Sequence, residues 1–249
     1  MSESEGHSED EGAGGVGDDS ARLSAAVPAG FLLVRVGEEG DPASFLELRR
    51  VTDREGRGVR CDLSAIRLRG GASEARGMPV VRALGDAQTV VDATAGLLGD
   101  AFLIAAAGRV VTAIERSPIV YELAKDGLAR AMRDPMLAEL LGGRLRLVHA
   151  DARVWLASRA GTEDAPDVVL IDPMFPPKKR ASALPRKEMV MLREVVGADL
   201  DAAELFERAR VTSKSRVVLK RADDTLELAA PDWTVRGTTV RFDVFTKKM

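Results

Sequence analysis

The sequence predicts an α/β fold, a doubly wound and mostly parallel sheet covered by helices. Three observations carry this prediction. After Asp86, short apolar runs alternate with segments of helical pattern, which is typical of parallel strands joined by crossover helices. The run at 168–171, Val-Val-Leu-Ile, is apolar throughout, as expected for a strand buried on both faces. An acidic residue also stands at or shortly after the end of each of the first four predicted strands, where such folds bind ligands.

Each element of the predicted fold comes from a local pattern. Pro118 suits the first turn of a helix. The predicted strands are 89–91, 110–114, 145–148, 168–171 and 216–220. One predicted helix begins at 101, and the others cover 118–132, 154–158, 187–196 and 202–210. Residues 233–235 and 240–245 resemble a closing antiparallel hairpin.

The segment before this sheet has a different pattern. Residues 31–36, 45–48 and 59–63 are short apolar or alternating runs separated by Gly, Asp and Pro, so we expect a small, mainly antiparallel β-rich subdomain over 21–85. It ends in a basic, glycine-bearing stretch at 67–71. A solvated connector and an RNA-facing loop account for that stretch equally well.

Charge is distributed unevenly along the 249 residues. Residues 1–20 carry seven acidic side chains and no Lys or Arg, so the rest of a chain of formal charge −3 has a net charge of +4. The acidic, Gly- and Ser-rich tail lacks the apolar residues that would offset the entropy of ordering, and we expect it to be disordered. The mildly basic remainder permits a nucleic-acid partner without requiring one.

Composition argues against a membrane protein and against a zinc site. The longest apolar segments, such as 101–107, are too short to span a bilayer, and the N-terminus lacks the layout of a signal peptide. A single cysteine, Cys61, excludes an intramolecular disulfide, and only His7 and His149 could add imidazole ligands. We therefore expect a cytoplasmic, metal-free protein, and we favour a monomer.

Four acids follow neighbouring strands of the predicted sheet and should meet at one rim: Asp92, Glu115, Asp151 and Asp172. Glu115 comes 23 residues after Asp92, close to the spacing at which nucleotide-binding folds place an acid on ribose hydroxyls. Between them, Gly96 and its small neighbours allow the backbone to approach a ligand closely. The rim therefore suits a nucleoside.

The tetrapeptide Asp172-Pro173-Met174-Phe175 suits a planar amine. The exocyclic amine of a nucleobase is a poor nucleophile because its lone pair is delocalised into the ring. The Asp172 carboxylate, helped by the Pro173 carbonyl, would hold the amine hydrogens, while Phe175 stacks on an extruded base. The alternative is an Asp-Pro turn that ends a strand beside a buried Phe.

A cationic segment follows this tetrapeptide. Five cations lie within ten residues, namely Lys178, Lys179, Arg180, Arg186 and Lys187. Beside a base pocket they would neutralise phosphates and orient an RNA strand. The alternative is a solvated surface loop.

These motifs together resemble the RsmJ-type family of small-subunit ribosomal RNA guanine-N2 methyltransferases. The motifs that carry the resemblance are Asp92-Ala-Thr-Ala-Gly96, Asp100-Ala-Phe102, Glu115-Arg116, Asp-Gly-Leu-Ala-Arg at 126–130, Asp172-Pro-Met-Phe-Pro176, Lys187-Glu-Met189 and Val196-Gly-Ala-Asp-Leu-Asp201. They cover most of residues 86–249. Met174 replaces the second proline of the Asn/Asp-Pro-Pro-Tyr/Phe motif of amino-group methyltransferases.

The resemblance implies a Rossmann-like class I methyltransferase fold over 86–249, with S-adenosylmethionine as cofactor and ribosomal RNA of the small subunit as substrate. It implies cofactor contacts along the strand ends: Gly99 and Asp100 after the first strand, Glu115 and Arg116 at the ribose, Asp151 and Ala152 near the adenine, and Asp172 at the catalytic mouth. Asp92 and Gly96 complete this set. The family usually has Gly and Arg where this chain has Leu98 and Gly99, and some relatives have two serines at 151–152.

Other functions remain open from the residues alone. A nucleotide-dependent oxidoreductase shares the glycine turn and the acid, but Gly96-Leu97-Leu98-Gly99 lacks the G-x-G-x-x-G spacing. A catalytically silent RNA-binding module would have no use for Asp172 and Glu115. An amino-methyltransferase that acts on another base or on a protein glutamine also fits the tetrapeptide.

Overall fold

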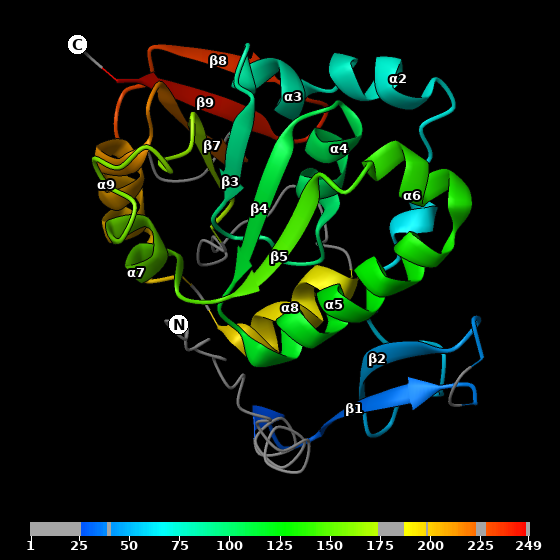
Figure 1. The fold of residues 1–249 in the computed structure, drawn as a ribbon. Helices are drawn as coiled ribbons and strands as arrows, with labels where there is room; N and C mark the ends of the chain where they lie inside the picture. The colour runs from blue at the N-terminus through cyan, green and yellow to red at the C-terminus, as the bar shows by residue number, and fades with distance from the viewer. Residues whose placement is uncertain (1–25, 39–40, 174–186, 198, 223–227, 248–249) are drawn as a thin grey trace, which may run out of the picture.

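The computed structural model describes residues 26–38, 41–173, 187–197, 199–222 and 228–247. Two sheets are present among these residues (Figure 1). The larger has seven strands in the order β5-β4-β3-β6-β7-β9-β8, and β1 pairs with β2 in the smaller. The predicted combination of a large, mostly parallel sheet and a small N-terminal antiparallel sheet is confirmed.

The strand order of the large sheet reverses at β3. Its parallel strands are β3 (Thr89–Asp92), β4 (Val110–Glu115), β5 (Leu145–His149), β6 (Val168–Ile171) and β7 (Arg216–Arg221). The closing hairpin, β8 (Trp233–Arg236) and β9 (Arg241–Thr246), adds to β7 in antiparallel register, as predicted. Because β4 and β6 flank β3 on opposite sides, the crossover helices leave on opposite faces. The switch point of the sheet, where such folds have their ligand crevice, is therefore at the carboxyl ends of these strands.

Helices cover both faces of the sheet. Helices α7 (Ala152–Ala157) and α9 (Ala202–Thr212) lie on one face. The other face is covered by α2 (Gly71–Gly77), α3 (Pro79–Leu84), α4 (Gly99–Ala106), α5 (Pro118–Arg133) and α6 (Pro135–Leu141). The side chains of β6 alternate between the two cores, with Leu170 facing α4 and Ile171 facing α9. This explains why the β6 run is apolar throughout.

Helix α6 was not predicted. The prediction ends a helix near 132, whereas the structure ends α5 at Arg133 and starts α6 two residues later. Pro135 cannot continue α5, and the Asp134 carboxylate accepts the backbone N–H groups of Met136 and Leu137. An N-cap followed by proline in the chain was the available signal.

The N-terminal sheet consists of β1 (Phe31–Val36) and β2 (Phe45–Arg50). The expectation of a further strand at 59–63 was wrong: Val59 forms only an isolated bridge with Leu48, and Leu63 begins the 3₁₀ turn η1 (Leu63–Ala65). Helices α2 and α3, at 71–77 and 79–84, were not expected in this β-rich segment, and they pack on α4, β8 and β9. The division of the chain at residue 85 stays a prediction.

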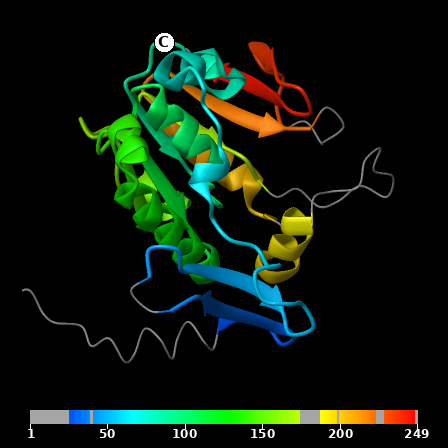
Figure 2. The same cartoon turned by 90° about the vertical axis from the view of Figure 1, so that its right-hand side faces the viewer.

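The small sheet is held against α5 and α8 (Lys187–Val196). Leu48 shares an apolar cluster with Leu123 of α5 and Met191 of α8. At its edge, the Asp126 carboxylate of α5 accepts the Leu46 N–H at 3.1 Å and pairs with Arg35 at 3.0 Å. Figure 2 shows the small sheet at one end of the molecule, beside α8 and far from β8 and β9. The small sheet therefore braces the two helices nearest the carboxyl ends of the strands.

Within the described ranges, no helix combines the length and the apolar character that crossing a membrane requires. The predicted acidic tail at 1–20 lies outside the described residues.

Candidate functional site

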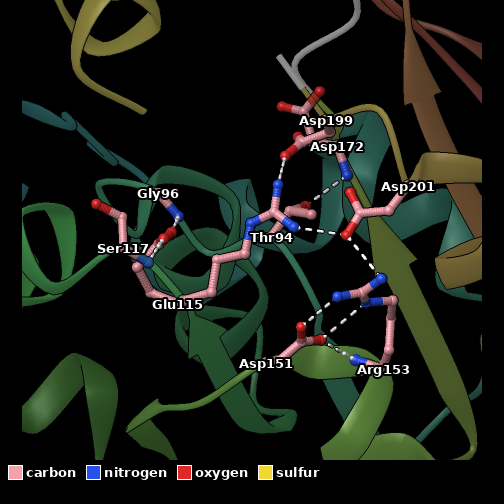
Figure 3. A network of polar contacts seen from close by, with 10 residues as sticks. Thr94, Gly96, Glu115, Ser117, Asp151, Arg153, Asp172, Asp199 and Asp201 are labelled. Atoms are coloured by element: carbon pink, nitrogen blue, oxygen red, sulfur yellow. Dashed lines mark hydrogen bonds and ion pairs between the residues drawn. The ribbon is translucent and has the colours of Figure 1, made fainter. Parts of the chain in front are cut away.

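One short loop after β3 connects the two most important predicted acids. The backbone N–H of Asp172 donates to Thr94 Oγ1 at 2.6 Å, and the backbone N–H of Gly96 donates to Glu115 Oε2 at 3.0 Å (Figure 3). Thr94 and Gly96 are two residues apart, so Glu115 and Asp172 lie on either side of the same turn. The acids at the ends of β4 and β6 therefore flank one turn at the switch point of the sheet.

The turn has open space beside its two glycines, and the buried side chain of Leu98 holds it to the core. An added Cβ at Gly96 would meet only the Thr94 carbonyl at 3.9 Å, and one at Gly99 would meet nothing within 4 Å. Leu98 has a left-handed φ of 64°, which costs an L-residue about 1–2 kcal/mol. Its side chain is 0% exposed in the core beneath α4, and this burial offsets the strain. The loop thus leaves room for a ligand while its backbone is fixed.

Glu115 is almost wholly enclosed at the end of β4, with 8% of its surface exposed. Its Oε1 accepts the Ser117 N–H at 2.7 Å, and its Oε2 accepts that of Gly96. Burial raises the pKa of Glu115, and these two N–H groups oppose the rise. A carboxylate offers about four acceptor positions, so two remain for ligand hydroxyls.

Lys220 of β7 bridges two carboxylates, a contact that the sequence reasoning missed. Its Nζ lies 2.7 Å from Asp100 Oδ2, in the first turn of α4, and 2.8 Å from Asp172 Oδ2. The Asp172 side chain keeps 39% of its surface exposed, so its carboxylate is reachable from solvent. Lys220 stands at the carboxyl end of the fifth parallel strand, and extending the rule of polar strand ends to that strand would have found it.

The carboxylates of this crevice repel one another. Burial and the charge of Asp100 raise the pKa of Asp92 to about 8, although its carboxylate accepts the Thr94 N–H at 3.2 Å. Burial also raises the pKa of Asp172, with Lys220 opposing the rise. Burial lowers the pKa of Lys220, but the charges of Asp172 and Asp100 outweigh it and raise that pKa.

A second group of charges continues along the rim toward β5. The Asp151 carboxylate caps α7 by accepting the Arg153 N–H at 2.8 Å, and it pairs with the Arg153 guanidinium at 2.6 Å. Arg116 pairs with Asp199 and, at 2.6 Å, with Asp201, both in the connection between α8 and α9 (Figure 3). Asp151 therefore has a structural partner in addition to its predicted role.

The connection between α8 and α9 also reaches the crevice itself. The charge of Asp199 contributes to raising the pKa of both Glu115 and Asp172. The resemblance motif at 196–201 contained Asp199 and Asp201, but the sequence did not indicate that they fold over the strand ends.

The structure thus brings six predicted site residues to one turn and its flanks. These are Asp92, Gly96, Gly99, Asp100, Glu115 and Asp172. Pro173 is buried directly after β6, Ala152 is the first residue of α7, and Lys187 is the first of α8. The remaining predicted residues lie outside the described part of the chain: Phe175, Lys178, Lys179, Arg180 and Arg186. The roles of all these residues stay predictions.

The described residues contain no group of three or more His, Cys, Asp or Glu side chains placed to hold a metal ion. The paired carboxylates of the crevice instead contact Lys220.

A family model links this geometry to known proteins. The SAM_MT model, which describes SAM-dependent methyltransferases, matches residues 37–247. The chain belongs to this family. It is 39% identical over 238 residues to the ribosomal RNA small subunit methyltransferase J of Vibrio campbellii, over 91% of this chain and 90% of that protein. The protein of that name from Chromobacterium violaceum is 41% identical over 180 residues, or 70% of this chain and 69% of its own.

A solved family structure has the same fold. The crystal structure of a SAM-dependent methyltransferase from Neisseria gonorrhoeae matches with a TM-score of 0.61 and 26% identity, and the match covers 92% of each chain. The predicted fold class and family resemblance are confirmed. The protein is an S-adenosylmethionine-dependent methyltransferase, and the oxidoreductase alternative is not supported.

The residues at the turn fit this cofactor. The two acceptor positions left on Glu115 would suit the two hydroxyls of its ribose. Gly96 and Gly99 leave open space beside the turn that could admit a ligand. The Asp100 carboxylate adds negative charge that suits a sulfonium and an ammonium group.

Proposed function

We propose that this enzyme methylates the exocyclic N2 amine of a specific guanosine in the RNA of the small ribosomal subunit. The observation that carries the proposal is the shared turn: Thr94 binds the backbone of Asp172, and Gly96 binds the carboxylate of Glu115. A nucleoside held at Glu115 and an amine held at Asp172 are then neighbours. The names of the two curated relatives support ribosomal RNA as the substrate.

Each residue of the crevice has a separate task in this proposal. Glu115 accepts hydrogen bonds from the ribose hydroxyls of the cofactor, and the turn at Gly96 and Gly99 positions the rest of the cofactor. S-adenosylmethionine supplies a methyl group already activated by a positive sulfur. The Asp172 carboxylate accepts the amine hydrogens, so the nitrogen lone pair turns toward the methyl group. Positioning therefore supplies most of the rate, and no strong base acts before attack.

Binding of the RNA is assigned to the segment after Pro173. The five cations between Lys178 and Lys187 come directly after the acceptor site in sequence, and their charge suits a phosphate backbone. Phe175 is assigned to stacking on the guanine. That the enzyme acts in the cytoplasm and that it is a monomer both stay predictions.

Methylation mapping tests the proposal directly. Small-subunit RNA from cells with and without the gene is digested and its methylated guanosines are mapped. We expect one N2-methylguanosine to disappear and to return with the wild-type gene but not with Asp172→Asn. Purified enzyme and labelled cofactor are then offered naked RNA and assembled small subunits, which identifies the form that is recognised. Loss of a methyl group from another base, or from a protein glutamine, would refute the assigned acceptor.

A further inference from the structure

We propose that Lys220 is a positioning residue for methyl transfer, which holds the Asp172 carboxylate ionised and directed at the acceptor amine. The inference deepens the proposed function and rests on the role assigned to Asp172. It identifies the fifth parallel strand as a contributor to the acceptor site, which the family motifs quoted above do not include.

The backbone fixes where Lys220 stands. Ile171 of β6 is paired with Leu219 of β7, so the next residues, Asp172 just after β6 and Lys220 within β7, lie at the same level of the sheet. Lys220 Nζ then lies 2.8 Å from Asp172 Oδ2 and 2.7 Å from Asp100 Oδ2. An ammonium group has three donors, so a single cation can orient both carboxylates.

The surrounding charges show why a cation is needed there. Asp172 is influenced by Asp100 of α4, Lys220 of β7 and Asp199 before α9, and its charge also acts on Asp92 of β3. Lys220 is the cation among these groups. Like charges that share a site favour protonation of one member, and burial acts in the same direction. Without Lys220, the pKa of Asp172 would rise further, and a protonated carboxyl would lose the negative charge and part of the acceptor capacity that the amine requires.

The apolar packing of β7 comes from the neighbours of Lys220. Val218 and Leu219 belong to the two cores, whereas the Lys220 side chain, 21% exposed, ends among carboxylates. The strand is held by β6 on one side and β9 on the other, and Phe242 is paired with Lys220 through the backbone. A methionine at 220 keeps the length of the aliphatic stem and removes only the charge and the donors, so we expect the protein to fold.

The test compares Lys220→Met and Lys220→Arg with wild type over a range from about pH 6 to about pH 9. Turnover is measured at saturating cofactor with small subunits from cells that lack the gene. We expect Lys220→Met to lower kcat by about 10- to 100-fold at neutral pH and to recover partly at high pH, because the acid limb of the profile moves upward. Lys220→Arg keeps a cation and should restore most of the rate and the original profile.

Cofactor binding separates this role from a direct contact with the cofactor. Calorimetry with S-adenosylhomocysteine should give a Kd for Lys220→Met within about threefold of wild type, which corresponds to less than about 1 kcal/mol. An equal loss of binding and turnover would overturn the proposal, and so would a fall in kcat with an unmoved pH profile. Lys125→Met removes a cation from the exposed side of α5 and should change neither quantity.

A double variant distinguishes the two proposals. If Lys220 acts through Asp172, Lys220→Met should lower turnover much less in an Asp172→Asn background than in wild type. Full additivity would refute the positioning role while leaving the proposed function intact. Undiminished turnover of Asp172→Asn would instead refute the assigned role of Asp172, whatever Lys220 does. Thermal denaturation of each variant verifies that the comparison involves folded protein.

Discussion

Two buried aspartates of this protein have opposite electrostatic environments. Asp126 of α5 has a side chain that is 7% exposed; burial raises its pKa, but hydrogen bonds from Leu46, Arg130 and Arg35 outweigh burial and lower it. Asp92 is more deeply buried, at 2% exposure, and burial together with the charges of Asp100 and Asp172 raises its pKa to about 8. The contrast separates an acid that stabilises the fold from acids that form a site. A site acid is costly in the empty protein and becomes favourable when a cationic or hydrogen-bond-donating ligand arrives.

The largest expected effect concerns Asp172. Asp172→Asn should lower kcat by about 100- to 1,000-fold, the loss typical when one preorganised electrostatic group is removed. Cofactor affinity should stay close to wild type, because Glu115 and the turn at Gly96 are intact. Single-turnover kinetics and calorimetry measure the two quantities. A matched loss of binding and rate would show that Asp172 belongs to the cofactor site instead.

The second prediction addresses the structural acid. Asp126→Ala leaves Arg130 and the Leu46 N–H without their acceptor, and we expect a loss of about 3 kcal/mol in the free energy of unfolding. Turnover per folded molecule should be unchanged. Because the folded-state pKa is lowered, the contribution of Asp126 is present above the unfolded pKa of about 3.9 and is lost as pH falls through the folded value.

Denaturant titrations at several pH values measure this stability, and Asp86→Ala, at an exposed position, is the control. An active-site defect in Asp126→Ala without destabilisation would erase the distinction between the two regions.

The third prediction concerns the cofactor. Glu115→Gln places an amide NH₂ against the N–H of Gly96 or of Ser117, since both oxygens of the acid serve as acceptors. We expect the Kd for S-adenosylhomocysteine to rise by about 10- to 100-fold, or about 1.4–2.7 kcal/mol. Glu122→Gln, on the exposed side of α5, is the matched control for calorimetry. Unaltered affinity would remove Glu115 from the cofactor site.

The smallest expected effect is a gain in stability. Asp92→Asn keeps an acceptor for the Thr94 N–H and removes a charge that the fold disfavours. A carboxyl with a raised folded-state pKa reduces stability as pH rises above its unfolded value of about 3.9, and the cost is complete above about pH 8. Asp92→Asn should therefore be more stable than wild type by about 1 kcal/mol at pH 8, with a Tm higher by about 2–4 °C.

The advantage of Asp92→Asn should shrink toward pH 5, where the wild-type carboxyl is protonated in the folded state. Calorimetric melting of the cofactor-free protein at both pH values decides this, and a constant difference would contradict the raised pKa.

The sheet and its rim were predictable because they follow from local periodicity. Apolar runs ending in an acid identify buried parallel strands, and their carboxyl ends must share an edge. Contacts between distant segments were not predictable. Asp-Gly-Leu-Ala-Arg at 126–130 belongs to the same family resemblance as the site motifs, yet Asp126 and Arg130 anchor the N-terminal segment. Resemblance alone does not separate a docking motif from a catalytic one.

Leu98 illustrates how a glycine-rich turn acquires rigidity. This chain has a leucine in the turn, whose side chain is 0% exposed although its backbone is left-handed. The backbone strain is smaller than the packing that would be lost with the side chain. The loop therefore reaches its shape during folding and has little left to organise when a nucleoside arrives, so association incurs a smaller loss of conformational freedom.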